Sequence, residues 1–533
     1  MNGFATASRG VLSDFLRTVV VIDDAAYHLG EEGEPIAELK APGRAPGKAQ
    51  DAGEPPARSQ SAHSLNTRVL VDSFARKGLT CAVLAPQRDE DLAALVDPVA
   101  ERCDIVVFDW QLGDDDGERT LERIKALCER DCGERLRLMC VYTGEPDLAK
   151  ISEKLCKEIG LKRVGDDRLL LRKGSVIVTI LAKKGSLTAT EYKDFLVDET
   201  EIADKLLDRF CGVTKGLLSN AVLAALAGIS RQAHRIVQKF DATLDPAYLA
   251  HRIMSVPVDN VEGEILSLIA SELGSVVYQS NASSHIDSAA IEQWMESAAA
   301  ARINYSPLPV KNSDGPELLK QLIKFGANKK VEAASSQFVQ ACTQVEAHAF
   351  IKASKLTELL GGEKPQEADR RFAMLSTLET RYKDFTLRLS LGTIVHDGCR
   401  YLLCLMPRCD SVRVPASGRD FLFIRLEEKS EEVHLIVEDN GKSVDLHVSK
   451  HPYHTVIYRV VPNTDGKSIF ARRGEDGKWG FAMQMPDGSS ALLRWVADMK
   501  PQIAQAVANE YAAQVCRVGV AKSQWLHNLG GKK

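Results

Sequence analysis

The sequence predicts a multidomain protein with a doubly wound, five-stranded parallel α/β domain, an all-helical central region and a mostly antiparallel β domain. At 533 residues the chain is too long for a single hydrophobic core. Strand-like and helix-like segments alternate in the first third, and the apolar pattern then becomes helical. From about residue 385 short alternating segments follow one another. We therefore expect domains at 1–186, 187–382 and 383–533.

The composition is that of an ordinary globular protein, with 44% hydrophobic and 26% charged residues. The net charge of −5 gives no basic excess of the kind that indicates nucleic-acid binding. The most apolar stretch, 216–229, is shorter than the roughly 20 residues of a membrane span, and no secretory signal is visible. Twelve scattered cysteines without paired CxxC motifs predict reduced thiols in a cytoplasmic protein.

The first domain starts with the apolar run 18–22, which is typical of a buried parallel strand. Residues 30–66 lose all periodicity and gather Gly, Pro, Ala and Ser, which predicts a flexible insertion. Further strands are expected at 80–84, 105–108, 136–142 and 175–182. Helices are expected at 67–77, 90–102, 118–129 and 146–159. The alternation predicts a parallel sheet with helices on both faces, and ligands bind such sheets beyond the carboxyl ends of the strands.

Chemically active side chains follow four of the five expected strands. The first strand is followed by Asp23 and Asp24, the third by Asp109 within DIVVFDWQLGDDDG, and the fourth by Thr143 within RLMCVYTGE. The fifth ends in the pair Lys183 and Lys184. Three crowded carboxylates repel one another until a hard cation such as Mg²⁺ neutralises them, so a cation site is expected here.

This arrangement resembles the receiver domain of two-component response regulators. By that resemblance Asp23, Asp24 and Asp109 bind Mg²⁺, and Asp109 is the nucleophile that accepts the phosphoryl group. The resemblance also assigns Thr143 as the switch hydroxyl and Lys183 as the phosphate-contacting lysine, with Lys184 a near-equal candidate because a slip of one residue exchanges them. Gly117 matches the glycine eight residues after the acceptor.

The sequence departs from the receiver pattern at three places. Gly113 stands where a proline is usual, and Gly144 follows the switch threonine where a small residue such as alanine is common. The insertion after Asp24 adds about 35 residues beside the expected pocket, where it could gate access or dock a partner. Phosphorylation of Asp109 and a phosphorylation-independent receiver therefore both stay open.

The remainder of the chain offers weaker candidate sites. His396, Cys399, Cys404 and Cys409 lie within fourteen residues and could bind zinc, but buried structural thiols are the favoured interpretation. Cys409 and Asp410 could line a site, for which His447, His451 and His454 are possible partners. Two further features have mainly structural interpretations: a basic helix face (Arg231, His234, Arg235, Lys239) and the tail residues Trp525 and Leu526.

The central region is expected to contain helices at 191–210, 262–278, 286–299 and 337–360, and a last helix is expected at 501–514. No Walker loop, HExxH, GxSxG or kinase motif set is present. The helix after the fifth strand leads into the helical region, so a signal could pass from the pocket to the rest of the chain.

The leading hypothesis is a non-enzymatic signalling or adaptor protein. Large fusions of divergent receivers to uncharacterised domains resemble components of bacterial anti-phage systems that act with GHKL-type ATPases (MutL-like or MORC-like). The resemblance implies such an ATPase or another defence component as protein partner, with nucleic acid reached through partners and no membrane. Two alternatives stay open. One is an effector enzyme or nucleic-acid-binding protein active in its C-terminal half, and the other an ordinary phosphorylated response regulator.

Overall fold

The computed structural model describes most of the chain in two compact units, which are residues 1–234 with 273–299 and residues 235–272 with 300–533. The described residues are 3–27, 65–87, 90–113, 115–131, 135–186, 188–255, 261–297, 302–306, 315–325, 355–362, 364–382, 387–412, 414–429, 431–449, 451–462, 468–484 and 490–515. The finer boundaries at 186 and 382 stay a prediction.

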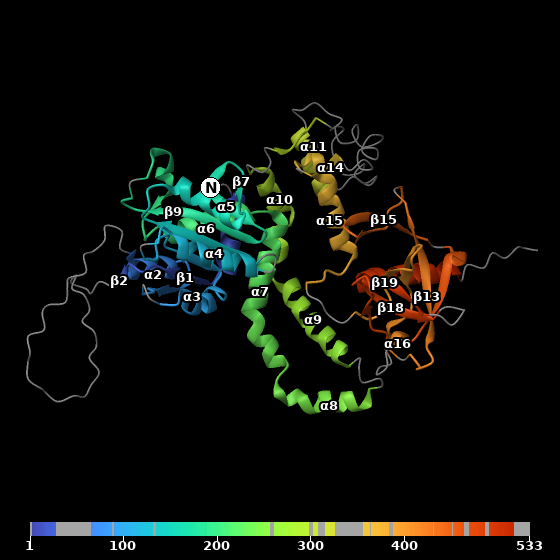
Figure 1. The fold of residues 1–533 in the computed structure, drawn as a ribbon. Helices are drawn as coiled ribbons and strands as arrows, with labels where there is room; N and C mark the ends of the chain where they lie inside the picture. Colours follow the sequence, from blue (N-terminus) through green and yellow to red (C-terminus); the bar gives the residue numbers. More distant parts are fainter. Residues whose placement is uncertain are drawn as a thin grey trace, which may run out of the picture. The chain divides into compact units, whose positions relative to one another are not determined.

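The first unit is built on the expected parallel sheet (Figure 1). Its five parallel strands lie in the order β4-β1-β5-β6-β9. They are β1 (Thr18–Ile22), β4 (Thr80–Leu84), β5 (Ile105–Phe108), β6 (Arg137–Thr143) and β9 (Val176–Lys183). Every residue of β5, β6 and β9 is buried, which agrees with the continuous Val, Ile and Leu runs of a sheet covered on both faces.

The sheet is larger than the sequence predicts. Strand β8 (Asp167–Lys173) pairs antiparallel with the first half of β9, and β7 (Lys162–Val164) extends the sheet beyond it. Strand β10 (Leu196–Val197) pairs in parallel with the end of β9, at Ala182 and Lys183. Along this edge of β9, the first half of the strand therefore pairs with β8 and its last residues pair with β10.

Helices cover both faces of this sheet. One face packs against α3 (Leu92–Ala100), α4 (Glu118–Asp131) and α5 (Leu148–Ile159). The other face packs against α1 (Gly3–Phe15), α2 (Thr67–Ala75), α6 (Ile202–Thr214) and the first half of α7 (Leu217–Lys239). Side chains of Asn66, Asp91 and Asp147 accept hydrogen bonds from the first turns of α2, α3 and α5, which ends the loops before these helices at defined residues.

Two expectations in this unit are wrong in detail. The helix expected at 191–210 is a 3₁₀ helix η1 (Thr190–Phe195), strand β10 and helix α6, because residues 196–197 join the sheet edge. The insertion expected at 30–66 ends before Leu65, which is fully buried, and Asn66, which caps α2. These two residues form β3 (Leu65–Asn66), which pairs with β2 (Ala26–Tyr27). The rest of the insertion lies outside the described residues.

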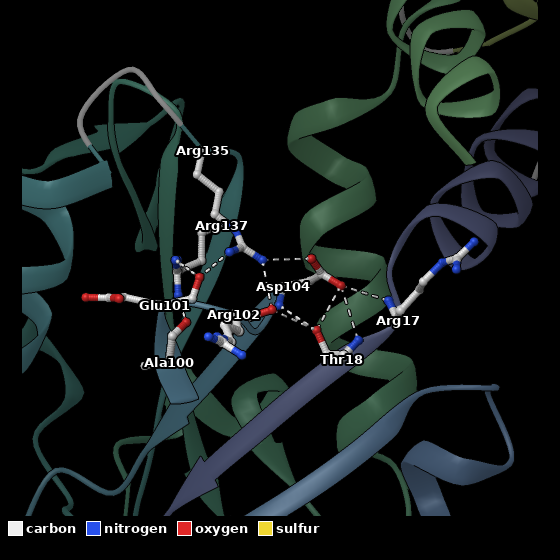
Figure 2. A network of polar contacts seen from close by, with 8 residues as sticks. All are labelled: Arg17, Thr18, Ala100, Glu101, Arg102, Asp104, Arg135 and Arg137. Atoms are coloured by element: carbon white, nitrogen blue, oxygen red, sulfur yellow. Dashed lines mark hydrogen bonds and ion pairs between the residues drawn. The ribbon is translucent and has the colours of Figure 1, made fainter. Parts of the chain in front are cut away.

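A polar network holds the amino end of the sheet, opposite the strand tips that carry the acids (Figure 2). The carboxylate of Asp104 accepts hydrogen bonds from the backbone N–H groups of Arg17 (2.9 Å) and Thr18 (3.1 Å) and from the side chain of Arg135 (3.2 Å). Fully buried Arg137 donates to the carbonyls of Ala100 and Glu101 at the end of α3. The Arg137 guanidinium suits this position because the carbonyl end of a helix carries partial negative charge. Together the contacts of Asp104 and Arg137 join β1, β5, β6 and α3.

The central region is helical, as the sequence predicts. Its described elements after α7 are η2 (Ala242–Leu244), α8 (Asp245–Met254), α9 (Val261–Gln279), η4 (Asn281–His285), α10 (Ser288–Met295), α11 (Gly315–Phe325), α14 (Lys355–Leu359) and α15 (Pro365–Thr377). Most of the helix expected at 337–360 lies outside the described residues. Among the described residues, no helix combines the length and apolar character needed to cross a bilayer.

The C-terminal part is the expected antiparallel β domain, and six of its strands close into a barrel (Figure 1). The ring runs β12-β11-β19-β18-β16-β13 and closes by pairing of β13 with β12. These strands are β11 (Thr393–His396), β12 (Tyr401–Cys404), β13 (Arg419–Glu428), β16 (Thr455–Val460), β18 (Trp479–Gln484) and β19 (Ser490–Asp498). Closure removes the exposed edges that an open sheet would present.

The barrel has an inner and an outer apolar cluster. Phe421, Phe423 and Phe481 fill the inner cluster. The outer cluster packs under the hairpin of β14 (Leu435–Asp439) and β15 (Lys442–Val448) and under α17 (Pro501–Val515), the expected last helix. The remaining elements among the described residues of this domain are α16 (Arg408–Ser411), η7 (Pro452–His454) and β17 (Arg472–Arg473).

Candidate functional site

The parallel register brings the ends of β1 and β5 side by side. Ile22 pairs with Phe108, so the next residues, Asp23 and Asp109, meet at the carboxyl edge of the sheet. The N–H of Asp109 donates to the carbonyl of Ile22 at 2.8 Å, which extends the pairing to the acid itself. Thr143 and Lys183 are the last residues of β6 and β9 and belong to the same edge.

Three carboxylates converge at this edge. Oxygen atoms of Asp23, Asp24 and Asp109 all lie within 4.8 Å of one another, and this is the one such group of possible metal ligands in the described parts of the chain. Asp23 is 1% exposed and Asp109 is 9% exposed, whereas Asp24 is exposed at the mouth. Hard oxygen donors at this spacing fit a divalent cation such as Mg²⁺.

The ammonium of Lys183 bridges two of these acids. Its Nζ lies 2.7 Å from Oδ2 of Asp23 and 2.8 Å from Oδ2 of Asp109. Lys184 points away from the acids, and its Nζ pairs with Asp198 at 2.9 Å in an exposed position. The structure therefore places Lys183, and not its neighbour, in the acidic pocket.

Burial and charge set the protonation of the pocket. Burial, together with the neighbouring charges of Asp23 and Asp24, raises the pKa of Asp109 to about 6, although Lys183 opposes the shift. Although Asp24 is exposed at the mouth, partial desolvation of its carboxyl group raises its pKa, against a hydrogen bond from Gly113. Burial disfavours the ammonium of Lys183, but Asp109 and Asp23 outweigh burial and raise its pKa. Lys183 is thus charged at neutral pH, and Asp109 is mostly ionised.

The loop after Asp109 is shaped by two glycines. At Gly117 (φ +82°) a Cβ would lie 2.1 Å from the ring of Trp110, so no other residue fits there without movement. At Gly113 (φ +95°) the backbone N–H donates to Oδ2 of Asp24 at 2.9 Å. A proline has no N–H and cannot adopt this φ, which gives a physical reason for the departure from the receiver pattern at this position.

Thr143 is buried, and its hydroxyl oxygen accepts a hydrogen bond from the N–H of Glu145 at 3.1 Å. The side chain of Glu145 accepts from Nε2 of Gln111 at 2.6 Å. Gln111 lies in the loop after Asp109, so this contact connects the loops that follow β5 and β6. Gln111 and Glu145 were not predicted as site residues, because two polar residues in loops form no distinctive pattern in a single sequence.

The family described as "Response receiver domain" matches residues 15–187. The N-terminal domain is receiver-like. The match supports a signalling or regulatory role for the protein, and it covers the whole receiver-like sheet up to β9. No curated protein and no solved structure shows a significant match to the chain. The helical region and the β domain are therefore described by their structure alone.

The cysteine-rich segment of the β domain does not form a metal cluster among the described residues. Cys404 is buried inside the barrel, as expected. The expectation of buried thiols is wrong for Cys399 and Cys409, which are exposed in the β11–β12 turn and on the short helix α16. Cys399 lies in a surface turn and Cys409 lies on a short surface helix, so neither is on a strand that faces the apolar interior.

Cys409 and Asp410 are both exposed on α16, and the Asp410 carbonyl accepts a hydrogen bond from Arg419. The three histidines considered as partners have other neighbours. His447 stacks on His434, His451 stacks on Tyr453, and His454 contacts Ser449 and Glu427. A catalytic role for Cys409 and Asp410 stays a prediction without support from these contacts.

The basic helix face lies on the second half of α7, where Arg231, His234, Arg235 and Lys239 are exposed. Arg231 pairs with Asp14 at 3.3 Å and Lys239 pairs with Glu272 at 2.6 Å. These pairs agree with a solvated helix face. Trp525 and Leu526 lie outside the described residues.

Proposed function

We propose that this protein is a signalling component whose receiver-like domain accepts a phosphoryl group on Asp109. The observation that carries the proposal is the geometry around this carboxylate. Asp109 is nearly buried, its Oδ2 lies 2.8 Å from the Lys183 ammonium, and two further acids lie within 4.8 Å. An unrelated sheet with incidental surface acids would leave them solvated and apart.

The reaction would be a direct phosphoryl transfer. A carboxylate oxygen of Asp109 attacks the phosphorus of a small phosphodonor while the bond from phosphorus to the donor's leaving oxygen breaks, which leaves an acyl phosphate on Asp109. Lys183 would follow the negative charge onto the phosphoryl oxygens. Asp23, Asp24 and Asp109 would hold Mg²⁺, which when bound offsets the charge of the phosphoryl group.

The test is labelling of the full chain with acetyl phosphate and Mg²⁺, read by intact-protein mass spectrometry. We expect the mass of one phosphoryl group to be added to the wild type and not to Asp109→Asn. Asp14→Asn, which changes an exposed acid outside the pocket, is the matched control and is expected to label normally. Absence of labelling in the wild type, or labelling that survives in Asp109→Asn, would contradict the proposal.

A phosphorylation-independent receiver is the second candidate, and the Lys183 bridge favours it. The ammonium already pairs with both buried acids, so these two carboxylates have a cationic partner without a bound metal ion. Under this alternative the wild type would not label, while Mg²⁺ binding measured by calorimetry would be weak or absent.

For the cellular role we propose anti-phage defence in bacteria, with a GHKL-type ATPase or another defence component as partner. The support is the association of a divergent receiver-like domain with large additional domains, which is an argument from analogy. Affinity capture of the tagged full chain from its native host tests it. Enrichment of such an ATPase by the wild type and a changed yield with Asp109→Asn are expected. Recovery of unrelated housekeeping proteins alone would oppose this role.

A further inference from the structure

Tyr142 lies directly before Thr143 on β6, and the phosphoryl transfer proposed above does not use it. Its side chain is 2% exposed. The centre of its ring lies 5.9 Å from Nζ of Lys183, within the range at which an aromatic ring attracts a cation. The ring therefore lies beside the Lys183 ammonium, which donates a hydrogen bond to Asp109.

The hydroxyl of Tyr142 reaches a different element. It donates to the carbonyl of Val197 at 2.8 Å, and that carbonyl also accepts from the backbone N–H of Lys184 at 3.2 Å. Val197 belongs to β10, where it pairs with Lys183. One side chain thus contacts both the pocket lysine and the short strand that lies beside it.

Strand β10 leads directly into helix α6. Asp198 follows it, pairs with Lys184 at 2.9 Å and accepts a hydrogen bond from the N–H of Thr200 at 3.1 Å. Helix α6 begins at Ile202, and its apolar face packs on the sheet. A change at β10 therefore reaches the start of α6 within a few residues.

Burial of Tyr142, with the nearby charges of Glu199 and Asp198, raises the pKa of its phenol. The hydroxyl therefore stays protonated at neutral pH and remains a donor to Val197. Loss of its ring interaction or of its hydrogen bond would each change a local equilibrium several-fold.

We propose that Tyr142 couples the charge of Asp109 to β10 and, through β10, to the start of α6. Loss of negative charge at Asp109 releases the contact between Lys183 and Asp109, the ammonium moves, and the Tyr142 side chain and its bond to Val197 loosen. This inference deepens the proposed function, since it names the route by which the pocket would reach the helical region. It does not require that Asp109 be phosphorylated.

A second set of contacts holds α6 to the sheet without involving the pocket. Arg209 on α6 donates to the hydroxyl of Thr179 at 2.9 Å and pairs with Asp167 on β8. Thr179 lies on β9, four residues before Lys183. Thr179→Val therefore removes a hydrogen bond between the sheet and α6, comparable to the bond that Tyr142→Phe removes between the sheet and β10. It serves as the matched control.

The experiment is hydrogen exchange of the full chain, followed by mass spectrometry on peptides that cover 194–210. Four proteins are compared: wild type, Asp109→Asn, Tyr142→Phe and the double variant. Two further proteins, Thr179→Val alone and combined with Asp109→Asn, repeat the cycle in the control background. No phosphodonor is added, so the outcome is independent of labelling.

We expect Asp109→Asn to speed exchange in these peptides by about two- to ten-fold, the factor that corresponds to one lost hydrogen bond. In the Tyr142→Phe background this increase should shrink to within error, and in the Thr179→Val background it should persist. An equal increase in the wild-type and Tyr142→Phe backgrounds, or no effect of Asp109→Asn on these peptides in the wild-type background, would overturn the coupling. Neither result would bear on phosphorylation, which the mass measurement with acetyl phosphate decides.

Discussion

The ring of Trp110 occupies the space that a side chain at Gly117 would need, with an added Cβ only 2.1 Å from the indole. Trp110 directly follows Asp109, so this close approach shapes the loop that carries the acceptor. The hydroxyl of Thr120 adds a hydrogen bond to the Asp109 carbonyl at 2.7 Å. Gly117 therefore has a steric role as well as a conformational one.

Gly117→Ala is expected to lower the stability of the receiver-like domain by about 2–4 kcal/mol, because it adds a steric clash to an unfavourable positive φ. Gly78→Ala is the control, since Gly78 has a similar φ of +75° and open space around it. It should cost only about 1 kcal/mol. Both losses of stability are measured by thermal unfolding of the full chain. Hydrogen exchange in peptides of this domain follows the unfolding. Equal losses would show that the contact with Trp110 does not matter.

In the Mg²⁺-free protein, protonation of the Asp109 carboxylate is expected to have its midpoint near the pKa of about 6, because burial disfavours the charged form. Carbon NMR of labelled aspartate should show the carboxyl group losing its proton as pH increases through this value. Lys183→Met removes the positive charge that lowers the pKa of Asp109, so the midpoint should move to higher pH.

Lys184→Met changes the exposed neighbouring lysine and should leave the midpoint unchanged. A midpoint that is identical in wild type and Lys183→Met would contradict the assigned role of the ammonium.

Asp104→Asn is expected to destabilise the sheet by about 1–3 kcal/mol without altering labelling of Asp109, because Asp104 accepts bonds from Arg17, Thr18 and Arg135 at the opposite end of the strands. Asp14→Asn, in an exposed ion pair with Arg231, should change stability by less than about 1 kcal/mol. Denaturant unfolding and the mass measurement give the two readouts. Loss of labelling in a folded Asp104→Asn protein would argue against this separation of roles.

In the β domain, Asp439 is nearly buried and accepts two hydrogen bonds from Arg494 (both 2.6 Å) and one from Tyr401 (2.8 Å). Asp439→Ala would leave the guanidinium without this partner, and a loss of about 3 kcal/mol is expected. Asp420→Ala breaks the exposed pair with Arg459 and should cost at most about 1 kcal/mol.

The Asp439 pair also predicts a pH dependence. The hydrogen bonds from Arg494 lower the pKa of Asp439 below 3.8. The pair therefore stabilises the folded β domain above that pH, and this stabilisation is lost as pH falls through the lowered folded-state pKa. Acid unfolding of Asp439→Ala should lack this component, which urea titrations between neutral and acidic pH would reveal. The same acid dependence in both proteins would disprove it.

Much of the receiver-like domain could be predicted because its signals are local. The apolar runs of β1, β5 and β9 predict buried parallel strands, and residues that follow such strands must meet at one edge. The sequence alone therefore places Asp23, Asp24, Asp109 and Thr143 together, with either Lys183 or Lys184 beside them. The prediction of one helix at 191–210 was wrong because the pairing of Leu196 and Val197 with β9 is a contact between segments that are not adjacent in the sequence.

The amino-acid sequence alone determined the order of strands and helices, the edge where the acids gather and the change from helical to β structure, since each depends on periodicity along the chain. Only the tertiary structure decided that Lys183 rather than Lys184 enters the pocket, that Gly113 donates to Asp24, that Tyr142 contacts β10 and that the β strands close into a ring. The reason is physical: side-chain direction at a strand end, and pairing between strands far apart in sequence, depend on packing that no local pattern records.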